Sequence, residues 1–370
     1  MKKVLFLIHD LSVGGAEKVL VNLANNVDKS KFDVTVMTLF DVGVNRQFLK
    51  PDVRYLSCFK HVFPGNSHVM KLLSPRRLHK IFIKEHYDIE IAYLEGPSAR
   101  MISGCAAPDT KLVAWIHSRQ HDANYAAKSF RGVQEAKKSY SKFNKIISVS
   151  QTVQEVFQKA LGVKTQYEVL YNTNESAEIL ERAKESIEGA LIHKDEINLV
   201  GVGRLIEIKG FDRLLRIAHR LREENYPVHV YLLGVGPEKD KLEAYAKEHG
   251  MESTVTFLGY QTNPYKYVAK CDLFVCSSFS EGFSTAATEA LIVGTPVCTV
   301  EVAGMKEMLG ENNEYGVVVP NDEEALYNGI KGFLDDPKLL RHYKQKAKER
   351  GTTFSTENTV RAVENMLLSL

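Results

Sequence analysis

Apolar segments rich in β-branched residues alternate with longer segments of helical period along the whole chain. In the first half, the apolar runs predict strands at 4–10, 33–39, 88–94, 111–117, 145–150 and 166–172, and the periodic segments predict helices near 16–27, 76–86, 130–140 and 151–161. Alternation of this kind is typical of βα units, in which helices connect parallel strands. The first half therefore predicts a doubly wound α/β domain.

The same pattern starts again near residue 197. It predicts strands at 197–205, 229–234, 255–260, 273–278, 296–300 and 315–320, with helices near 210–224, 238–249, 284–293 and 322–334. Residues 173–196 carry charge without a strong apolar stripe, which favours a linker helix. We therefore expect an N-terminal Rossmann-like domain over 1–172, a linker over 173–196, a second Rossmann-like domain over 197–350 and a C-terminal helix over 351–370.

Length and composition agree with this division. The chain has 370 residues, of which 44% are hydrophobic and 25% are charged, and this is more than one compact core usually holds. Disordered and fibrous classes are excluded. In open α/β sheets, ligands bind beyond the carboxyl ends of the strands. We expect two Rossmann-like domains that face a central cleft, with the functional residues in that cleft.

The cysteines and the apolar runs indicate a cytoplasmic protein. Five cysteines, an odd number, are widely spaced and mostly lie in apolar runs, which favours reduced, buried thiols. No pair has the spacing of a zinc finger, so a metal site is not expected. The apolar start of the chain ends at His9 and Asp10, too early for a signal peptide, and no run of about 18 apolar residues is present.

Charge is divided unevenly along the chain. Residues 1–170 contain 25 Lys and Arg against 15 Asp and Glu, whereas the remaining residues contain 23 against 31. The formal net charge of +2 is therefore the sum of a basic first part and an acidic second part. The basic excess is greatest at five residues interleaved with apolar ones: Lys71, Arg76, Arg77, Lys80 and Lys84. A solvated helix face explains this cluster, and so does a surface that meets an anionic membrane or a phosphate-bearing acceptor.

Two adjacent glycines, Gly14 and Gly15, follow the first predicted strand and precede a helix. They allow a tight turn whose backbone N–H groups can face an anion, although such a turn also serves simply to join a strand to a helix. A dinucleotide-binding fingerprint requires G-x-G-x-x-G, which neither this turn nor the glycines at 201–203 and 234–236 supply. A Rossmann dehydrogenase is therefore disfavoured.

Two cations flank a predicted loop in the second half. Arg204 ends the strand that begins at residue 197, and Lys209 precedes the next helix. A guanidinium and an ammonium at the carboxyl end of a strand can bind a diphosphate. The alternative interpretation is that both are ordinary charged residues of the protein surface. A cation just before a helix N-terminus is not favoured by the helix dipole, which points to a role other than helix stability.

Two carboxylates and a histidine are further candidates. Glu281 precedes a helix of small and apolar residues, where it either contacts a ligand or complements the helix dipole. Glu289 lies more than one turn inside that helix, and a buried carboxylate needs donors; a ribose diol provides two, and a salt bridge is the alternative. His117 ends the apolar strand 111–117, so it faces the cleft or serves as a structural histidine.

Together these residues resemble glycosyltransferase family 4, whose members have the GT-B fold. The similarity covers nearly the whole chain, and the E-x7-E element at Glu281 and Glu289 with Arg204 and Lys209 upstream is specific in combination. It rests on GGAEK (14–18), AWIHS (114–118), VLYN (169–172), GVGRLIEIKGFDRLL (201–215), LLGVGPEKDKL (232–242), VTFLGY (255–260), EGFSTAATEALIVGTPV (281–297) and GVVVP (316–320).

The resemblance implies a retaining transfer of a sugar from a nucleotide-diphosphate donor, a UDP-sugar by family frequency, to a glycan or lipid-linked acceptor in cell-surface polysaccharide synthesis. It implies that Arg204 and Lys209 hold the diphosphate, Glu289 binds the ribose, Glu281 contacts the donor sugar, and His117 contacts the sugar hydroxyls and the reaction face. The remaining donor-binding residues that it implies are Gly14, Gly15, Gly259, Tyr260, Phe283 and Ser284.

One segment departs from the family pattern. Members often have EGF followed by Gly or Pro and then apolar residues, whereas residues 284–288 here are small and hydroxylated, which leaves the donor preference open. The chain also contains no Asp-x-Asp pair, so Arg204 and Lys209 are expected to supply the positive charge, without a metal or a tightly bound cofactor.

Other functions remain open from the residues. They are a GT-B enzyme of another reaction, such as a nucleotide-sugar epimerase or a sugar phosphorylase, a glycoside hydrolase that uses Glu281 and Glu289, and a non-catalytic nucleotide-sugar-binding subunit. The expected partners are the nucleotide-sugar donor and the acceptor, with no nucleic acid. The expected location is the cytoplasm, with contact to the inner face of the membrane through the basic segment 71–84.

Overall fold

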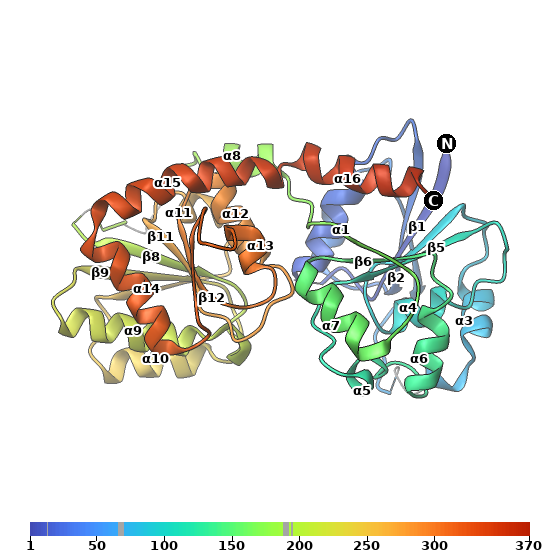
Figure 1. Ribbon diagram of the computed structural model, residues 1–370, viewed down its shortest axis with the longest axis horizontal. Coiled ribbons are helices and arrows are strands. Elements are labelled where there is room, and N and C mark those ends of the chain that lie inside the picture. The colour runs from blue at the N-terminus through green and yellow to red at the C-terminus, as the bar shows by residue number, and fades with distance from the viewer. Residues whose placement is uncertain (13, 66–69, 188–191, 194) are drawn as a thin grey trace. The chain divides into compact units, whose positions relative to one another are not determined.

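The computed structural model describes residues 1–12, 14–65, 70–187, 192–193 and 195–370. The chain forms two compact units (Figure 1). Unit 1 contains Met1–Asn174 and Thr356–Leu370, and unit 2 contains Glu175–Ser355. None of the described helices is both long and apolar enough to cross a membrane.

Unit 1 is built on a seven-stranded parallel sheet in the order β3-β2-β1-β4-β5-β6-β7. Its strands are β1 (Lys2–Ile8), β2 (Phe32–Phe40), β3 (Arg54–Phe59), β4 (Ile89–Ala92), β5 (Lys111–Ile116), β6 (Lys145–Ser148) and β7 (Gln166–Val169). The central strands are buried along nearly their whole length, as expected for a sheet covered by helices on both faces. The strand order reverses between β1 and β4, so their carboxyl ends flank a switch point at which ligands bind in such sheets.

The helices of unit 1 come from both ends of the chain. They are α1 (Gly15–Asn26), α3 (Pro75–Phe82), α4 (Pro97–Ile102), α5 (Ala123–Ala126), α6 (Val133–Tyr140), α7 (Gln151–Leu161) and α16 (Thr356–Leu368), with the 3-10 helix η1 (Val44–Phe48). The last helix, α16, packs on α1: Lys2 Nζ donates to the carbonyl of Leu367 at 3.0 Å, and Thr356 Oγ1 donates to the carbonyl of Asn174 at 2.7 Å. The end of the chain therefore belongs to the same unit as its beginning (Figure 1).

Unit 2 has a six-stranded parallel sheet in the order β10-β9-β8-β11-β12-β13. The strands are β8 (Ile197–Val202), β9 (Val228–Leu233), β10 (Val255–Gly259), β11 (Leu273–Cys276), β12 (Val297–Val300) and β13 (Val317–Val319). The helices are α8 (Ser176–Arg182), α9 (Phe211–Glu223), α10 (Lys239–Glu248), α11 (Tyr265–Val268), α12 (Thr285–Val293), α13 (Met305–Leu309), α14 (Glu323–Asp335) and α15 (Pro337–Gly351), with η2 (Glu207–Lys209) and η3 (Thr352–Phe354). The order reverses between β8 and β11, which brings the loops after these two strands together at one edge.

The α/β class and the two doubly wound sheets predicted from the sequence are confirmed. Strand β3 was not predicted, because it is an edge strand whose residues are exposed or only partly buried and so lacks a continuous apolar run. The helix expected in the linker corresponds to α8, while residues 188–191 and 194 of that linker lie outside the described residues.

A close backbone contact fixes the loop after β8 to the segment after β11. Gly210, at the start of α9, has a left-handed φ of 61°, and a Cβ atom there would lie 2.1 Å from the carbonyl oxygen of Ser277. Ser277 Oγ donates to the carbonyl of Lys209 at 3.0 Å, and the buried Arg213 donates through Nε to the carbonyl of Ser277 at 2.6 Å. The backbone of Lys209 is therefore held against the residues that follow β11.

Replacing Gly210 with alanine tests this contact. We expect Gly210→Ala to lower the free energy of unfolding by about 3 kcal/mol, because both the left-handed backbone and the clash with Ser277 penalise a Cβ atom. Gly250→Ala is the matched control, since Gly250 has a φ of 63° but no atom within 4 Å of its Cβ position; it is expected to cost only about 1 kcal/mol. Urea unfolding followed by circular dichroism measures both, and equal losses would show that the contact with Ser277 is unimportant.

Candidate functional site

The carboxyl edge of the unit 2 sheet holds an ion pair between two of the predicted site residues. Lys209, at the end of η2, places Nζ 2.7 Å from Oε1 of Glu281, in the segment between β11 and α12. Ser278 Oγ donates to the same carboxylate oxygen at 2.6 Å. The side chains of Lys209 and Glu281 are 24% and 11% exposed, so the pair is largely shielded from solvent but not fully buried.

Arg204 lies beside this pair in sequence but is not part of it. It follows β8, its side chain is exposed, and within the described part of the chain it forms no ion pair or side-chain hydrogen bond. The aliphatic part of Lys209 passes close to the backbone beside Arg204: a Cβ atom on Gly203 would be in ordinary van der Waals contact with two of its carbons, at 3.5 and 3.6 Å. The loop thus presents one tethered and one untethered cation at the same strand end, which is suited to binding an anion.

Glu289 is buried, as the sequence predicted, with an exposed fraction of 7%. It lies in the middle of α12, a helix that begins after Ser284 and ends at the left-handed Gly294. Tyr265 OH, on α11, donates to Glu289 Oε1 at 3.4 Å. Tyr265 was not singled out from the sequence, because nothing in the local pattern shows that α11 packs on α12.

The other predicted donor-binding residues of unit 2 have diverse surroundings. Phe283 is buried, and its ring packs edge-on against Phe354 with centroids 5.9 Å apart. Ser284 caps α12, since its hydroxyl accepts from the backbone N–H of Ala287 at 3.3 Å. Gly259 ends β10 with a left-handed φ of 65°, and Tyr260 after it is 53% exposed. Phe283 and Ser284 therefore shape the loop, whereas Tyr260 is available for contact.

In unit 1, His117 follows directly after β5. Its ring lies 4.8 Å from the ring of Tyr93 and 6.1 Å from that of Trp115, measured between centroids. Burial lowers the pKa of His117 to about 3, and its Nε2 atom is buried without a hydrogen-bond partner among the described residues. His117 is therefore a neutral imidazole with an unused polar atom.

Glu95 holds the segment around His117 in place. Its carboxylate accepts from the backbone N–H of His117 at 2.9 Å, from Gln120 Nε2 at 3.1 Å and from the hydroxyl of Ser118. Burial raises the pKa of Glu95. Glu95 was not among the predicted site residues. Its place just beyond the predicted strand 88–94 was a usable signal, because polar residues at strand carboxyl ends gather at one edge.

Gly14 and Gly15 stand at the start of α1, beyond the carboxyl end of β1. Gly14 has extended backbone angles and precedes the helix, and Gly15 is its first residue. Gly14, as the N-cap residue, has no side chain that could cap the helix. Val13, within the same predicted turn, lies outside the described residues.

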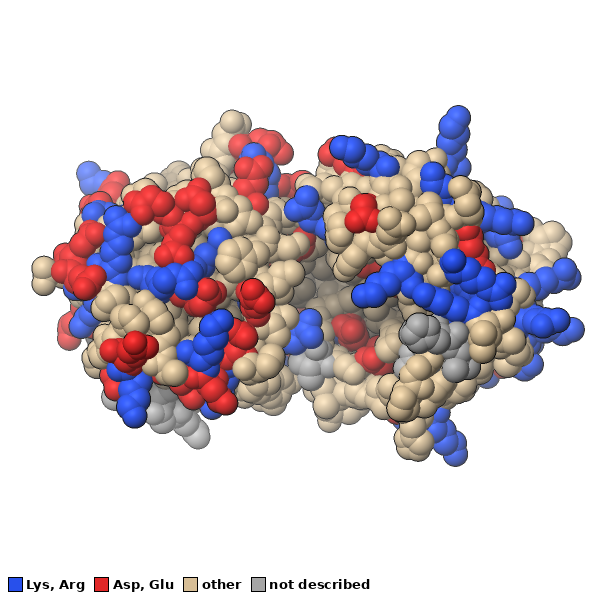
Figure 2. All heavy atoms as spheres, turned by 90° about the horizontal axis from the view of Figure 1, so that it is seen from below, with Lys and Arg blue, Asp and Glu red and all other residues tan. Residues whose placement is uncertain are grey.

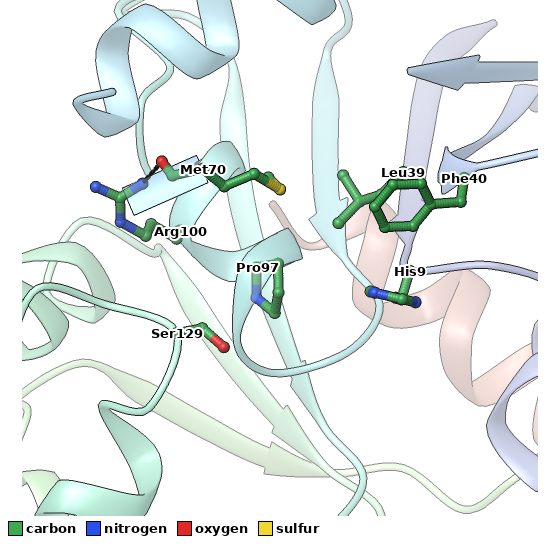
Figure 3. Close-up of a pocket in the computed structure, with 7 residues that line it drawn as sticks. All are labelled: His9, Leu39, Phe40, Met70, Pro97, Arg100 and Ser129. Carbon is green, nitrogen blue, oxygen red and sulfur yellow. Dashed lines mark hydrogen bonds between the residues drawn. The ribbon is translucent and has the colours of Figure 1, made fainter. Parts of the chain in front are cut away.

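A pocket lies at the carboxyl side of β1 and β2 in unit 1 (Figure 3). It is lined by His9, Leu39, Phe40, Met70, Pro97, Arg100 and Ser129. Arg100 is buried and already bound to Glu135, at 3.0 Å, and to the carbonyl of Met70, at 2.8 Å. His9 Nδ1 is 2.7 Å from Asp10 Oδ2, and this hydrogen bond lowers the pKa of Asp10 to about 2. The pocket therefore combines apolar walls with fixed polar groups.

Comparison with known proteins decides the family. The model for glycosyl transferases group 1 matches residues 183–350, and that for Glycosyltransferase Family 4 matches residues 13–173. An N-acetylgalactosamine-N,N'-diacetylbacillosaminyl-diphospho-undecaprenol 4-alpha-N-acetylgalactosaminyltransferase of Campylobacter jejuni is 30% identical over 388 residues, with 100% of both chains covered. The chain belongs to glycosyltransferase family 4. It is therefore a glycosyltransferase, as its motifs predicted.

Solved structures show the same fold. Alr3699/HepE of Anabaena, crystallised in complex with UDP, matches 100% of both chains with a TM-score of 0.78 and 20% identity. TarM of S. aureus matches with a TM-score of 0.74 and 16% identity over 99% of each chain. The two parallel-sheet units of this glycosyltransferase thus correspond to the GT-B fold.

The depressed pKa of His117 predicts how the stability of unit 1 depends on pH. Between pH about 6.5 and about 3, the unfolded chain binds a proton at His117 that the folded state does not bind. The free energy of unfolding therefore falls as the pH decreases through this window, by about 2 kcal/mol for His117 between pH 7 and pH 5. His117→Asn should remove this part of the loss.

The single tryptophan, Trp115, lies in unit 1 beside His117, so its fluorescence during urea unfolding reports the relevant transition. His121→Asn is the control, because the side chain of His121 is 60% exposed. If the free energy of unfolding depends on pH equally in the wild type and in His117→Asn, the neutral state assigned to His117 is refuted.

Proposed function

We propose that this glycosyltransferase moves a hexose-type sugar from a UDP-sugar to a lipid-linked or glycan acceptor, with retention of anomeric configuration and without a metal ion at the donor site. The observation that carries the proposal is the Lys209–Glu281 pair next to the untethered Arg204 at one strand edge. The named relatives support it: Alr3699/HepE has been crystallised with UDP and with UDP-glucose, and the Campylobacter relative is named for a diphospho-undecaprenol substrate.

The two cations fit the charge that develops in such a transfer. When the bond between the sugar's anomeric carbon and the diphosphate oxygen breaks, negative charge grows on the leaving nucleoside diphosphate. Arg204 can donate two parallel hydrogen bonds to phosphate oxygens, and Lys209 adds a point charge held in position by Glu281. The acceptor oxygen bonds to the anomeric carbon, and its proton passes to the departing phosphate.

Metal independence rests on the same residues. The chain has no Asp-x-Asp pair of the kind that binds a divalent ion at a donor diphosphate. Arg204 and Lys209 provide two positive charges on the strand edge where the diphosphate is proposed to bind. These two side-chain cations then neutralise the diphosphate, as a divalent ion does in other transferases.

The remaining donor contacts follow from burial and position. Glu289, buried in α12, is proposed to accept from the two ribose hydroxyls in addition to the hydrogen bond from Tyr265. Tyr260 is proposed to meet the base, because it is exposed beyond β10. Gly14 and Gly15 allow the backbone at the start of α1 to approach the diphosphate. The buried Nε2 of His117 is proposed to contact a donor-sugar hydroxyl.

Unit 1 is proposed to contact an anionic membrane at the cytoplasmic face. On the face of unit 1 seen in Figure 2, Lys and Arg side chains predominate, whereas on unit 2 both signs are mixed. Helix α3 buries Leu78 and exposes Arg76, Arg77 and Lys80. Nearby Leu72 is 77% exposed, so apolar and basic side chains are presented together. This is the combination that favours binding to anionic lipid.

Nucleotide binding tests the role of Arg204. We expect Arg204→Ala to weaken UDP binding about 10- to 100-fold, the loss of one or two charge-assisted hydrogen bonds. Isothermal titration measures the affinity. Arg341→Ala is the control, because Arg341 is an exposed arginine of α15 in the same unit. Unchanged affinity for Arg204→Ala would remove Arg204 from the donor site.

Vesicle sedimentation tests the membrane contact. The double variant Arg76→Glu/Arg77→Glu should reduce binding to vesicles containing phosphatidylglycerol more than about tenfold, since each cation near anionic lipid contributes about 1 kcal/mol. Lys338→Glu/Arg341→Glu makes the same charge change on exposed residues of unit 2 and should bind as wild type does. If the wild type binds vesicles of pure phosphatidylcholine as strongly as vesicles that contain phosphatidylglycerol, the contact is not electrostatic.

Donor consumption distinguishes the remaining alternatives. A nucleotide-sugar epimerase would turn over the donor without any acceptor, and a sugar phosphorylase would require inorganic phosphate. A non-catalytic subunit would bind UDP without turnover. The proposed transferase consumes its donor only with a glycan or lipid-linked acceptor, apart from slow hydrolysis.

A further inference from the structure

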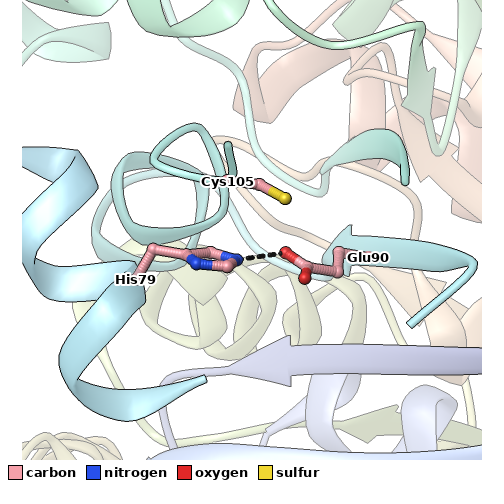
Figure 4. Close-up of side chains that lie close together, drawn as sticks. All are labelled: His79, Glu90 and Cys105. Atoms are coloured by element: carbon pink, nitrogen blue, oxygen red, sulfur yellow. Dashed lines mark hydrogen bonds and ion pairs between the residues drawn. The ribbon is translucent and has the colours of Figure 1, made fainter. Parts of the chain in front are cut away.

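A second cluster of polar side chains lies in unit 1, away from the residues assigned to sugar transfer. His79 comes from α3, Glu90 from β4 and Cys105 from the segment after α4. Figure 4 shows that the three side chains point toward one another from these separate elements. One ligand-type atom from each lies within 4.8 Å of the other two.

The cluster is shielded from water at its base. The side chain of Glu90 is 2% exposed and that of His79 is 14% exposed. The Nε2 atom of His79 lies 2.8 Å from Oε2 of Glu90. Within the described residues, no lysine or arginine pairs with Glu90. A carboxylate buried this deeply requires a positive partner, which is either a protonated His79 or a cation bound beside it.

An imidazole nitrogen, a carboxylate oxygen and a thiolate sulfur are the three ligand types of zinc sites in proteins. Zinc bonds of about 2.0–2.3 Å place neighbouring ligands of a tetrahedral ion roughly 3–4 Å apart, a spacing that small side-chain rotations reach from the observed one. We propose that His79, Glu90 and Cys105 bind a divalent transition-metal ion of the zinc class, with water as the fourth ligand.

Charge balance supports this assignment. A thiolate at Cys105 and the carboxylate of Glu90 together offset the two charges of the ion, while His79 coordinates as a neutral imidazole. The buried site is then neutral as a whole, which avoids the cost of burying an isolated charge. Cys105 is only partly buried, so the ion has a route in from the surface.

The position of the cluster indicates a structural role. Glu90 lies near the amino end of β4, whereas Glu95 and His117 lie beyond the carboxyl ends of β4 and β5. A bound ion would link α3, the helix that carries the exposed basic residues, to the central sheet and to the segment after α4. The proposal concerns folding of unit 1 and does not depend on the sugar-transfer reaction.

This site lacks the paired cysteines at zinc-finger spacing by which a metal site is recognised in a sequence. Its proposed ligands are one histidine, one glutamate and one cysteine, which lie 11 and 15 positions apart along the chain. They meet only because α3 and α4 pack together beside β4.

Zinc titration of the full-length, untagged, chelator-stripped protein tests the proposal. Zinc affinity is measured by competition with a chromophoric chelator. We expect wild type to bind one zinc ion per chain and Cys105→Ser to bind it more than about 100-fold more weakly, because a direct ligand is lost. Cys58→Ser is the matched control, since Cys58 is another partly buried cysteine of unit 1, and it should bind zinc as wild type does.

Cobalt provides a second readout that does not require any variant to fold. Cobalt(II) bound to the wild type should show thiolate-to-metal charge-transfer absorption. If Cys105→Ser binds zinc as tightly as the wild type does, the proposal is overturned. The ion would then bind elsewhere, such as at His193, Glu196 and His229, which also lie close together. Absence of the cobalt absorption in wild type would overturn it as well.

Discussion

The salt bridge between Lys209 and Glu281 is the interaction on which the proposed donor site depends. It joins the loop after β8 to the segment after β11, the two strands between which the order of the unit 2 sheet reverses. Backbone contacts at Gly210 and Ser277 hold the same two segments together. The ammonium is thereby fixed before any ligand arrives, and preorganised charge of this kind contributes strongly to catalysis.

The fold was predictable because both sheets are parallel and buried. Continuous apolar runs predicted nearly all the central strands. The strand–helix alternation begins again near residue 197, and this predicted the second unit. Strand β3 and the short helices α4, α5, α11 and α13 were missed, because an edge strand and single-turn helices carry too little periodic signal. That α16 packs on α1 could not be inferred, since its apolar face does not specify a partner.

The candidate site was predictable where a residue stands at a strand end or in a known motif. Arg204, Lys209, Glu281 and Glu289 were singled out as candidates in this way, and the structure adds the Lys209–Glu281 ion pair and the burial of Glu289. Partners supplied by other elements were not found. Tyr265 reaches Glu289 from α11, and the local sequence does not show that α11 packs on α12. Glu95 reaches His117 from beyond β4, and only its place after a predicted strand could have indicated it.

The most direct test of the account is the affinity for UDP in the presence of EDTA and in the presence of magnesium, measured by isothermal titration. Because the zinc ligands proposed above lie in unit 1, the comparison is repeated in Cys105→Ser to separate them from the donor site. If the side-chain cations bind the diphosphate, the two dissociation constants agree within about twofold, and Lys209→Ala weakens both equally. UDP binding that appears only with a divalent ion would contradict the central claim.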